Sequence, residues 1–262
     1  MDHILDFWNK QAETHKTSHS ASWGDLYMVE IERDFIFKEL KNNNPNTVLD
    51  CGTSNGHSLI DLAKEFPNIQ FSGFDFSKSM IEMFKNSLND EPIMNISTPF
   101  EADIRDLSSL NSTFDFIFTT RVLINLPTWE EQKEGIRQMI NTLNKGGKLL
   151  IMEGFWEPLC NLNSLRLSAN IHPLREHDFN RYLKKESLEA FLVDLKLNFV
   201  NKDFSSTYYL LTRFVRETIG VDKLDQAYTS SFNLYAKQLN NQYLDYTRRN
   251  EFGIQQAYII TK

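Results

Sequence analysis

One segment of this 262-residue chain organises the others: Thr47-Val48-Leu49-Asp50-Cys51-Gly52-Thr53-Ser54-Asn55-Gly56-His57-Ser58. An apolar β-type run comes first, two glycines four positions apart follow, and an apolar-periodic segment begins at Ser58. This order predicts a strand, a tight turn and the start of a helix. Because Gly52 and Gly56 lack a Cβ and tolerate positive φ, the backbone can approach a ligand closely, and the unpaired N–H groups of the helix start favour a negative group.

Composition limits the classes of protein to consider. The length allows one large domain, or one domain carrying a cap, with a sizeable core. A net charge of -7 repels polyanions, so we expect no nucleic-acid partner. The sequence has no apolar run of 18 or more residues, and acids occupy the start where a signal peptide is basic, so we expect a cytoplasmic protein and no membrane contact. Cys51 and Cys160 lack metal-ligand or disulfide-framework spacing, so we expect reduced thiols and no metal.

From residue 47 onward, apolar β-type runs alternate with helical periodicity. The predicted strands are 47–50, 69–75, 94–101, 114–120 and 147–153, and the predicted helices between them are 57–65, 78–88 and 128–143. Strands separated by helices indicate a parallel sheet with right-handed crossovers.

The flanking segments have a different character. Residues 1–45 predict helices with a small polar break at 16–22, an arm that would lie across the carboxyl ends of the strands. Residues 154–185 lack clean periodicity, which favours a functional loop or short helices. The remaining pattern predicts a helix at 185–195, β runs at 198–204 and 207–214, helical spacing over 215–247 and a last strand at 253–262.

Acidic residues follow the second and third predicted strands. Asp75 lies 23 residues after Gly52, close to the spacing of about 20 at which an acid binds ribose hydroxyls in nucleotide-binding folds. The alternative is a helix cap, since a helix follows. Asp103 and Ile104 come next along the cleft, where they would accept from an adenine amino group and pack on its face. A solvated loop is the alternative for Asp103.

The fourth predicted strand ends in polar groups that face the same cleft: Thr120, Arg121 and Asn125. An arginine just past a buried strand is costly to desolvate without an anionic partner. That partner is either a ligand carboxylate or phosphate, or a carboxylate of the protein.

Together these residues resemble the four landmarks of class I S-adenosylmethionine-dependent methyltransferases: Asp50–Gly56, Asp75, Asp103-Ile104 and the turn Leu143–Leu149. The resemblance covers about residues 20–155. It implies an α/β fold with a Rossmann-like, doubly wound sheet of seven strands, mostly parallel with an antiparallel last strand. The helical N-terminal arm and helical insertions would form a cap.

The resemblance also implies a domain organisation and a cofactor. The chain would be a single methyltransferase domain over 1–262, with a helical arm or lid at 1–45, a cofactor-binding core at 46–155 and acceptor-side insertions at 156–185 and 215–250. The cofactor would be S-adenosylmethionine, with S-adenosylhomocysteine as product. The residues implied to bind it are Asp50, Gly52, Ser54, Gly56, Asp75, Phe76, Asp103, Ile104, Thr120 and Arg121. Ser54 stands where the family usually has glycine, and it fits there if its φ is negative.

The flanks resemble a bacterial branch of these enzymes that is associated with surface-polysaccharide (capsule) or other small-molecule modification. The similar segments are Phe7–Ala12, Ser22–Asp25, Arg121–Leu126 and His177–Leu183. This resemblance does not identify the acceptor; we expect O-methylation of a hydroxyl on a small molecule, with N-methylation left open. Arg166, Arg175, Arg181 and Arg213 would favour an anionic acceptor, such as an activated sugar or phosphorylated precursor, if two or more converge. The residues expected to contact the acceptor are Trp23, Asn125, Arg166, Asn180, Tyr182 and Arg213.

The implied reaction is attack by the acceptor on the methyl carbon of a sulfonium, which needs no metal. Orientation can supply up to about 7–11 kcal/mol in such reactions. A base typically adds about 100- to 10,000-fold for an alcohol acceptor. His177, in the irregular segment, is the first candidate base, and Glu153, at the end of the fifth strand, is the second.

Two other functions fit parts of the pattern. A nicotinamide-dependent oxidoreductase shares the strand-turn-helix, but the turn lacks the third glycine of G-x-G-x-x-G and has Ser54 at the second. A non-catalytic module would keep the cofactor site and only present a surface. The chain is expected to be a monomer or homodimer, and 215–250 would be a lid or a dimer arm.

Overall fold

The computed structural model describes residues 2–220, 223–243 and 251–262. In this part of the chain, seven strands form one sheet in the order β3-β2-β1-β4-β5-β7-β6. Their bounds are β1 Thr47–Cys51, β2 Gln70–Asp75, β3 Phe100–Glu101, β4 Phe114–Thr120, β5 Leu143–Gly154, β6 Asn198–Lys202 and β7 Gln255–Thr261. β7 runs antiparallel to both neighbours, and the other pairings are parallel. This confirms the expected sheet, including its antiparallel last strand.

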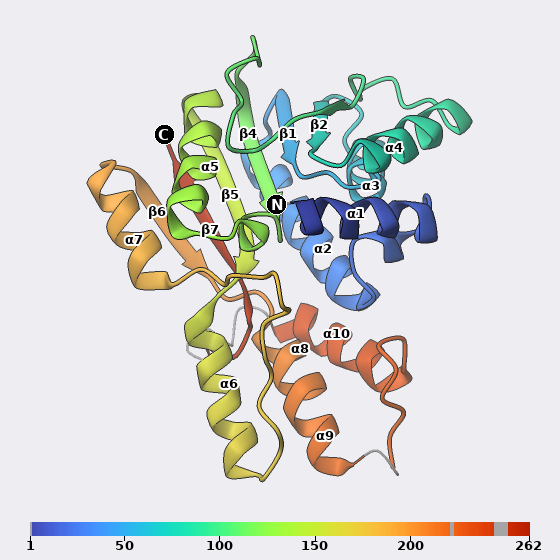
Figure 1. Ribbon diagram of the computed structural model, residues 1–262, viewed down its shortest axis with the longest axis vertical. Helices are drawn as coiled ribbons and strands as arrows, with labels where there is room; N and C mark the ends of the chain where they lie inside the picture. Colours follow the sequence, from blue (N-terminus) through green and yellow to red (C-terminus); the bar gives the residue numbers. More distant parts are fainter. Residues whose placement is uncertain (1, 221–222, 244–250) are drawn as a thin grey trace.

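The helices surround the sheet and extend beyond one end of it (Figure 1). Their bounds are α1 Asp2–His15, η1 His19–Ala21, α2 Leu26–Asn43, α3 His57–Glu65, α4 Lys78–Asp90, η2 Leu123–Asn125, α5 Trp129–Thr142, α6 Trp156–Ser168, α7 Lys185–Asp194, α8 Ser206–Leu210, η3 Leu211–Val215, α9 Arg216–Ile219 and α10 Ser231–Tyr243. None of these helices combines the length and hydropathy that a membrane span needs.

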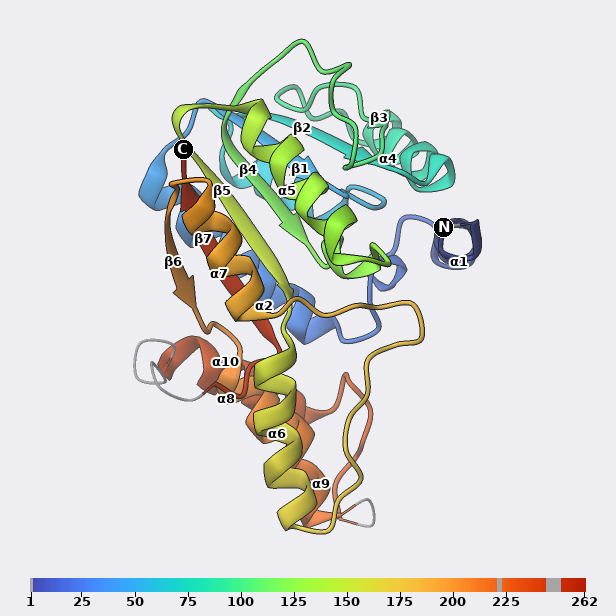
Figure 2. The ribbon, with the colours of Figure 1, turned by 60° about the vertical axis from the view of Figure 1, so that its left-hand side comes forward.

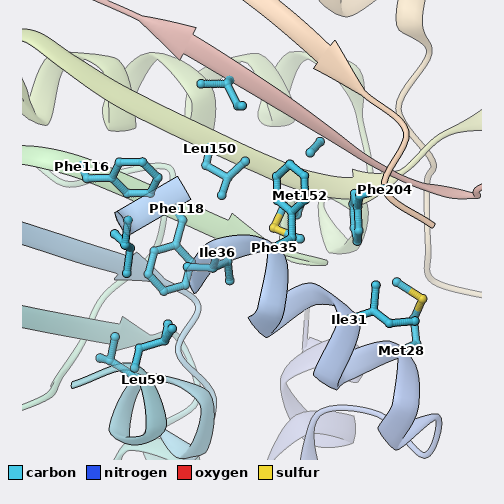
Figure 3. Packing of buried hydrophobic residues seen from close by; sticks show 14 of the residues in the cluster. Met28, Ile31, Phe35, Ile36, Leu59, Phe116, Phe118, Leu150, Met152 and Phe204 are labelled. Carbon is cyan, nitrogen blue, oxygen red and sulfur yellow. The ribbon is translucent and has the colours of Figure 1, made fainter. Parts of the chain in front are cut away.

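Two apolar layers cover the sheet, one on each face. α2 and α3 pack on one face, and α5 and α7 pack on the other. In Figure 3, Ile36 of α2 lies against Phe118 of β4, while Phe35 lies beside Met152 of β5. Because both faces of the parallel strands are covered, polar side chains reach solvent or a ligand only at the strand ends. The ends of the strands are therefore where the site must lie.

Local signals set the starts of the helices in the core. Thr128 caps α5 by accepting from the N–H of Glu131, and its hydroxyl donates to the Glu131 carboxylate at 2.8 Å. Thr128 therefore acts as the N-cap of α5, satisfying one of the free N–H groups of its first turn. Ser77 caps α4 in the same manner by accepting from the N–H of Met80. The helix of 57–65 and the strand of 114–120 have the bounds predicted for them.

The prediction of a β run at 207–214 is wrong. These residues form α8 and the π-helical turn η3. Tyr208, Tyr209 and Thr212 are β-type residues, but the backbone N–H of Tyr208 donates to Asn240 and the Thr212 hydroxyl donates back to the Tyr208 carbonyl. Packing against α10 therefore overrides the local preference.

Two other segments differ from their predicted lengths. The third strand shrinks to two residues, preceded by an isolated bridge between Phe71 and Ile96. In the segment that lacked periodicity, α6 takes up the first part and 169–182 is mostly irregular. Helical spacing was expected over 215–247, where α9 and α10 lie; 244–247 fall outside the described residues.

The arm and the cap lie at the same end of the sheet. α1 crosses beside α4 at the carboxyl ends of β1 and β2 (Figure 1). α6, α8, α9 and α10 extend beyond the carboxyl end of β5 (Figure 2). The strand ends that carry the predicted site residues are thus overlaid by helices from both ends of the chain.

Candidate functional site

A pocket opens at the carboxyl ends of β1, β2 and β4. It encloses about 1160 Å³, the open solvent at its mouth included. The arm, α2 and the start of α3 form its other walls. Nine of the ten residues implied to bind the cofactor line it: Asp50, Gly52, Ser54, Asp75, Phe76, Asp103, Ile104, Thr120 and Arg121. Gly56 does not line the pocket but begins α3 directly behind it.

The glycine turn is left-handed at three positions. The φ angles are 84° at Gly52, 53° at Ser54 and 77° at Gly56. A Cβ added to Gly52 would lie 2.2 Å from Val122, and one added to Gly56 would lie 2.1 Å from Phe84. Both glycines are thus required by backbone conformation and by packing. The condition set for Ser54, a negative φ, is not met: this residue adopts a left-handed backbone.

Asp75 ties this turn to the end of β2. One carboxylate oxygen accepts from the Ser54 N–H at 2.9 Å, and the other accepts from the Ser77 N–H at 2.9 Å. The side chain is buried, and burial raises its pKa to about 6. Burial also raises the pKa of Asp50, at the end of β1, to about 7. Two carboxylates that prefer a positive or hydrogen-bonding partner therefore face the pocket.

The next wall is formed by the residues that follow β3 and β4. Asp103 accepts from the Arg105 guanidinium at 2.6 Å, and although partial burial opposes ionisation, these hydrogen bonds hold its pKa below the ordinary value. Ile104 presents an apolar side chain beside it. The Thr120 hydroxyl is buried and finds no hydrogen-bond partner within the described residues. A buried hydroxyl without a partner at a pocket wall is a place for a ligand to bind.

Arg121 has a protein partner. Its Nε lies 3.1 Å from Glu32 Oε1, its Nη1 donates to the Ser22 carbonyl at 3.1 Å, and its guanidinium lies 4.9 Å from the Trp23 ring centre. Burial raises the pKa of Glu32, while the charge of Arg121 lowers it. Of the two alternatives for the anionic partner, the structure thus contains a carboxylate of the protein. Asn125 follows Arg121 and lines the pocket. Among the described residues, no other predicted acceptor contact lines it.

The N-terminal arm closes the pocket through polar contacts. Trp8 Nε1 donates to Asn125 at 3.2 Å, and the Ser77 hydroxyl donates to Asn9 at 2.7 Å. The Asn55 amide donates to the carbonyls of Lys16 and Ser18 at 2.9 and 2.8 Å. The sequence predicted the position of the arm but none of these bonds, because each joins residues that are distant along the chain.

Among the residues that line the pocket without having been predicted to do so are Trp8, His19, Asn55 and His57. Trp8 belongs to the predicted helical arm and Asn55 to the glycine turn, so the sequence had placed both residues beside the site. The two histidines stood in segments interpreted as a lid and as a helix start, so only the folded chain brings them together.

The two candidate bases lie away from the pocket wall. Glu153 is buried, and its carboxylate accepts from the N–H groups of Val122, Leu123 and Ile124 at 2.9, 3.0 and 3.3 Å. Burial raises its pKa to about 7. The Glu153 carboxylate therefore fixes the backbone of η2, the turn that follows β4 and Arg121.

His177 lines a second, more open hollow beside α6. Its ring centre lies 4.4 Å from that of Phe179 and 5.9 Å from that of Phe7. Phe7 packs edge-on against Trp8, which lines the main pocket. The arm thus stands between His177 and the cofactor residues.

The arginines of the acceptor half do not converge on the pocket. Arg166 is buried against Glu217, with 2.7 Å between Nη2 and Oε2, and Arg213 is buried against Asp25. Arg175 and Arg181 line the second hollow. Two of the four arginines therefore meet at the second hollow, and none of the four lines the main pocket.

Three predicted acceptor contacts remain: Asn180, Tyr182 and Trp23. The Asn180 N–H donates to the His177 carbonyl at 2.8 Å. The Tyr182 ring packs on Gly154, where an added Cβ would lie 2.9 Å from it, and burial raises the pKa of Tyr182 to about 12. Trp23 stacks on Arg121 as described above. None of these three lines the main pocket.

Comparison with known proteins matches the part of the chain that carries the turn. A family model described as a methyltransferase domain matches residues 48–147. A demethylmenaquinone methyltransferase from Porphyromonas gingivalis is 28% identical over 139 residues, which cover 53% of this chain and 54% of that protein. The chain therefore spans about half the length of this curated relative.

Solved structures extend the likeness to nearly the whole chain. An S-adenosylmethionine-dependent methyltransferase from Clostridium acetobutylicum, 15% identical, has a TM-score of 0.56 and covers 88% of this chain and 91% of its own. The plantazolicin methyltransferase BamL, in complex with a substrate analogue and S-adenosylhomocysteine, is 14% identical, with a TM-score of 0.56 over 99% and 90%. At these identities the likeness shows the fold. Residues 48–147 thus match a methyltransferase-domain model, and the chain has the fold of solved S-adenosylmethionine-dependent methyltransferases.

Proposed function

We propose that the chain transfers the methyl group of S-adenosylmethionine to a small, uncharged acceptor that carries a ring. The observation that carries this proposal is the pocket itself, in which a left-handed glycine turn, Asp50 and Asp75 face an arm that closes over them. When bound, the cofactor supplies an electrophilic methyl group on a sulfonium.

The residues at the pocket fit this cofactor group by group. In our proposal Asp75 accepts from the ribose hydroxyls, because its carboxylate is held in place by two backbone N–H groups. Asp50 pairs with the ammonium of the amino-acid part, and Asp103 with Ile104 receives the adenine. The buried Thr120 hydroxyl, which has no partner among the described residues, donates to or accepts from the ligand.

The acceptor proposal follows from charge. The sequence led us to expect O-methylation of an anionic sugar or polysaccharide precursor. Binding such an anion requires arginines that are not already paired with a carboxylate of the protein. Arg166 and Arg213 are buried against Glu217 and Asp25, so they are neutralised before any ligand arrives, and Arg175 and Arg181 line the second hollow instead of the main pocket. The named acceptor of the Porphyromonas gingivalis relative is a demethylated menaquinone, which is an uncharged ring compound. We therefore propose a quinol or phenol-like ring, methylated at carbon or at a hydroxyl.

Orientation supplies most of the rate in this proposal. The carboxylate of Glu153 is occupied by three N–H groups, so its role is to position η2 and Arg121 rather than to accept the acceptor's proton. His177 lies behind Phe7 and Trp8. We expect His177→Ala to lower turnover by less than about tenfold, whereas loss of a general base typically costs about 100-fold or more.

The experiment is a product assay with two acceptor panels. Purified protein is incubated with S-adenosylmethionine and either quinols and phenols or phosphorylated and nucleotide-activated sugars, and S-adenosylhomocysteine is measured by mass spectrometry. Product formed with the ring panel supports the proposal. Product formed only with the sugar panel would establish the anionic acceptor instead, and binding of S-adenosylhomocysteine without turnover in either panel would identify a non-catalytic module.

A further inference from the structure

Three side chains with metal-binding atoms meet where the arm touches the start of α3. His57 and Asp61 lie on α3 four residues apart, which places them on the same side of the helix. His19 comes from η1 of the arm. The ligand atoms of the three residues all lie within 4.8 Å of one another, and the ring centres of His19 and His57 are 3.0 Å apart. All three side chains are half-buried.

The two imidazole rings have no hydrogen-bond partner in the described part of the chain. Within the described residues, neither ring forms a hydrogen bond to another protein group, and the nearest ionic contact is 4.0 Å, from His57 Nδ1 to Asp61 Oδ2. A neutral imidazole has a free lone pair, which is the form that binds a metal ion.

The carboxylate of the cluster is held from outside. Arg33 of α2 donates to Asp61 Oδ2. Carboxylates that bind metals are ordinarily hydrogen-bonded by a further residue, and such partners fix their orientation. Arg33 occupies that place. The arrangement of two imidazoles and one carboxylate suits Zn²⁺ and related divalent transition metals, with a further position left for water or a ligand.

The glycine turn brings the third ligand into position. The Asn55 amide holds the carbonyls of Lys16 and Ser18, so the arm segment that carries His19 is bound directly beside His57. His19 and His57 both line the cofactor pocket. A metal ion shared by the three residues would therefore join the arm to α3 across the rim of the pocket.

We propose that His19, His57 and Asp61 form a binding site for a divalent transition metal, with Zn²⁺ as the reference ion, and that this ion fastens the N-terminal arm over the pocket. The sequence had indicated no metal, because the ligands come from two segments without a recognisable spacing. The proposal does not depend on the methyltransferase function, since metal binding is measured without cofactor or acceptor.

Calorimetry tests the site. Metal-free protein is titrated with Zn²⁺ in a buffer that does not chelate metals. We expect one ion per chain, and His57→Ala and His19→Ala should each weaken binding by about tenfold to a hundredfold or more. His172→Ala is the matched control, since His172 is exposed and outside the cluster, and it should bind as the wild type does. No binding by the wild type, or equal binding by His57→Ala, would overturn the site; thermal unfolding checks that each variant is folded.

Limited proteolysis tests the fastening. Lys16 is exposed in the arm three residues before His19, so trypsin cleavage there reports opening of the arm. Zn²⁺ should slow this cleavage several-fold in the wild type and in His172→Ala, and should leave it unchanged in His57→Ala. Zinc binding without protection of Lys16 in the wild type would overturn the proposed link between the metal and the arm. Neither experiment uses turnover, so their failure is distinct from failure of the proposed reaction.

Discussion

The backbone N–H of Ser54 donates to Asp75 Oδ2 at 2.9 Å and thereby joins the glycine turn after β1 to the end of β2. The same carboxylate accepts from Ser77 through its other oxygen. Asp75 thus holds Ser77, the N-cap residue of α4, and also lines the pocket, so its structural hydrogen bonds leave the predicted ribose contact open. The geometry of the cofactor pocket depends on this one side chain and on the left-handed turn it holds.

Ser54→Gly should stabilise the protein. A left-handed conformation costs a residue with a Cβ about 1–2 kcal/mol, and glycine recovers this at an entropic cost of about 0.5–1 kcal/mol. With φ at 53°, we expect a net gain of about 0.5–1 kcal/mol in the free energy of unfolding, measured with urea. Ser87→Gly inside α4 is the control and should destabilise by a similar amount. A less stable Ser54→Gly would contradict the positive φ.

Removing either member of the Arg121–Glu32 pair should be costly. Both side chains are largely buried, and an unpaired buried charge typically costs about 3–5 kcal/mol. We expect Arg121→Met and Glu32→Gln each to lower the unfolding free energy by that amount, and the double variant to lose clearly less than the sum. Additive losses, within about 0.5 kcal/mol, would show that the two residues are not coupled.

Glu153 should make stability depend on pH. Its pKa rises from 4.5 to about 7 on folding, so the unfolded chain loses this proton first as the pH increases. Its contribution is fully present below about pH 4.5 and is lost as the pH rises through 7, a difference of about 3 kcal/mol. Denaturant unfolding between pH 4.5 and 7.5 should therefore show a shallower decline with pH in Glu153→Gln than in the wild type. Equal slopes would mean that Glu153 ionises normally.

Cofactor affinity should rise with pH in the same range. Burial raises the pKa of Asp50 to about 7 and that of Asp75 to about 6, and a ligand with an ammonium and ribose hydroxyls binds the ionised forms. Below these values each carboxylate must release a proton on binding, so affinity for S-adenosylhomocysteine should fall by up to about tenfold per pH unit for each group. Asp50→Asn should bind more weakly at pH 8 and show a flatter profile. An unchanged profile in this variant would remove Asp50 from the ammonium contact.

The sequence predicted the core well because its signals are local. The strand, turn and helix around Gly52 have strong hydrophobic periodicity, and each residue at their junctions has one physical role. Such local features were enough to predict α3, β4 and the residues of the pocket wall. The β run at 207–214 failed for the opposite reason. Tyr208 is fixed by Asn240 and by Asp25, which lie 32 and 183 positions away along the chain, and no local pattern reports such partners.

The site shows the same division. The cofactor wall follows from strand ends, which a sequence reveals. The acceptor side depended on whether arginines converge, and the partner of Arg213 is Asp25, 188 positions away. The contact between His19 and His57 likewise arises only when Asn55 holds the arm. The charge of the acceptor side and the metal-binding cluster therefore could not be predicted without the folded structure.

The most direct measurement of the central claim is calorimetric titration of S-adenosylhomocysteine into the wild type, Asp75→Ala and Asp115→Ala. Asp115 is the matched control, because it also accepts from two backbone N–H groups, those of Asn46 and Thr47, and it lies outside the pocket. Hydrogen bonds to charged groups are worth about 1.5–3 kcal/mol, so Asp75→Ala should bind about tenfold to a hundredfold more weakly. Asp115→Ala should bind as the wild type does. Wild-type affinity in Asp75→Ala would contradict the assignment of this pocket to the cofactor.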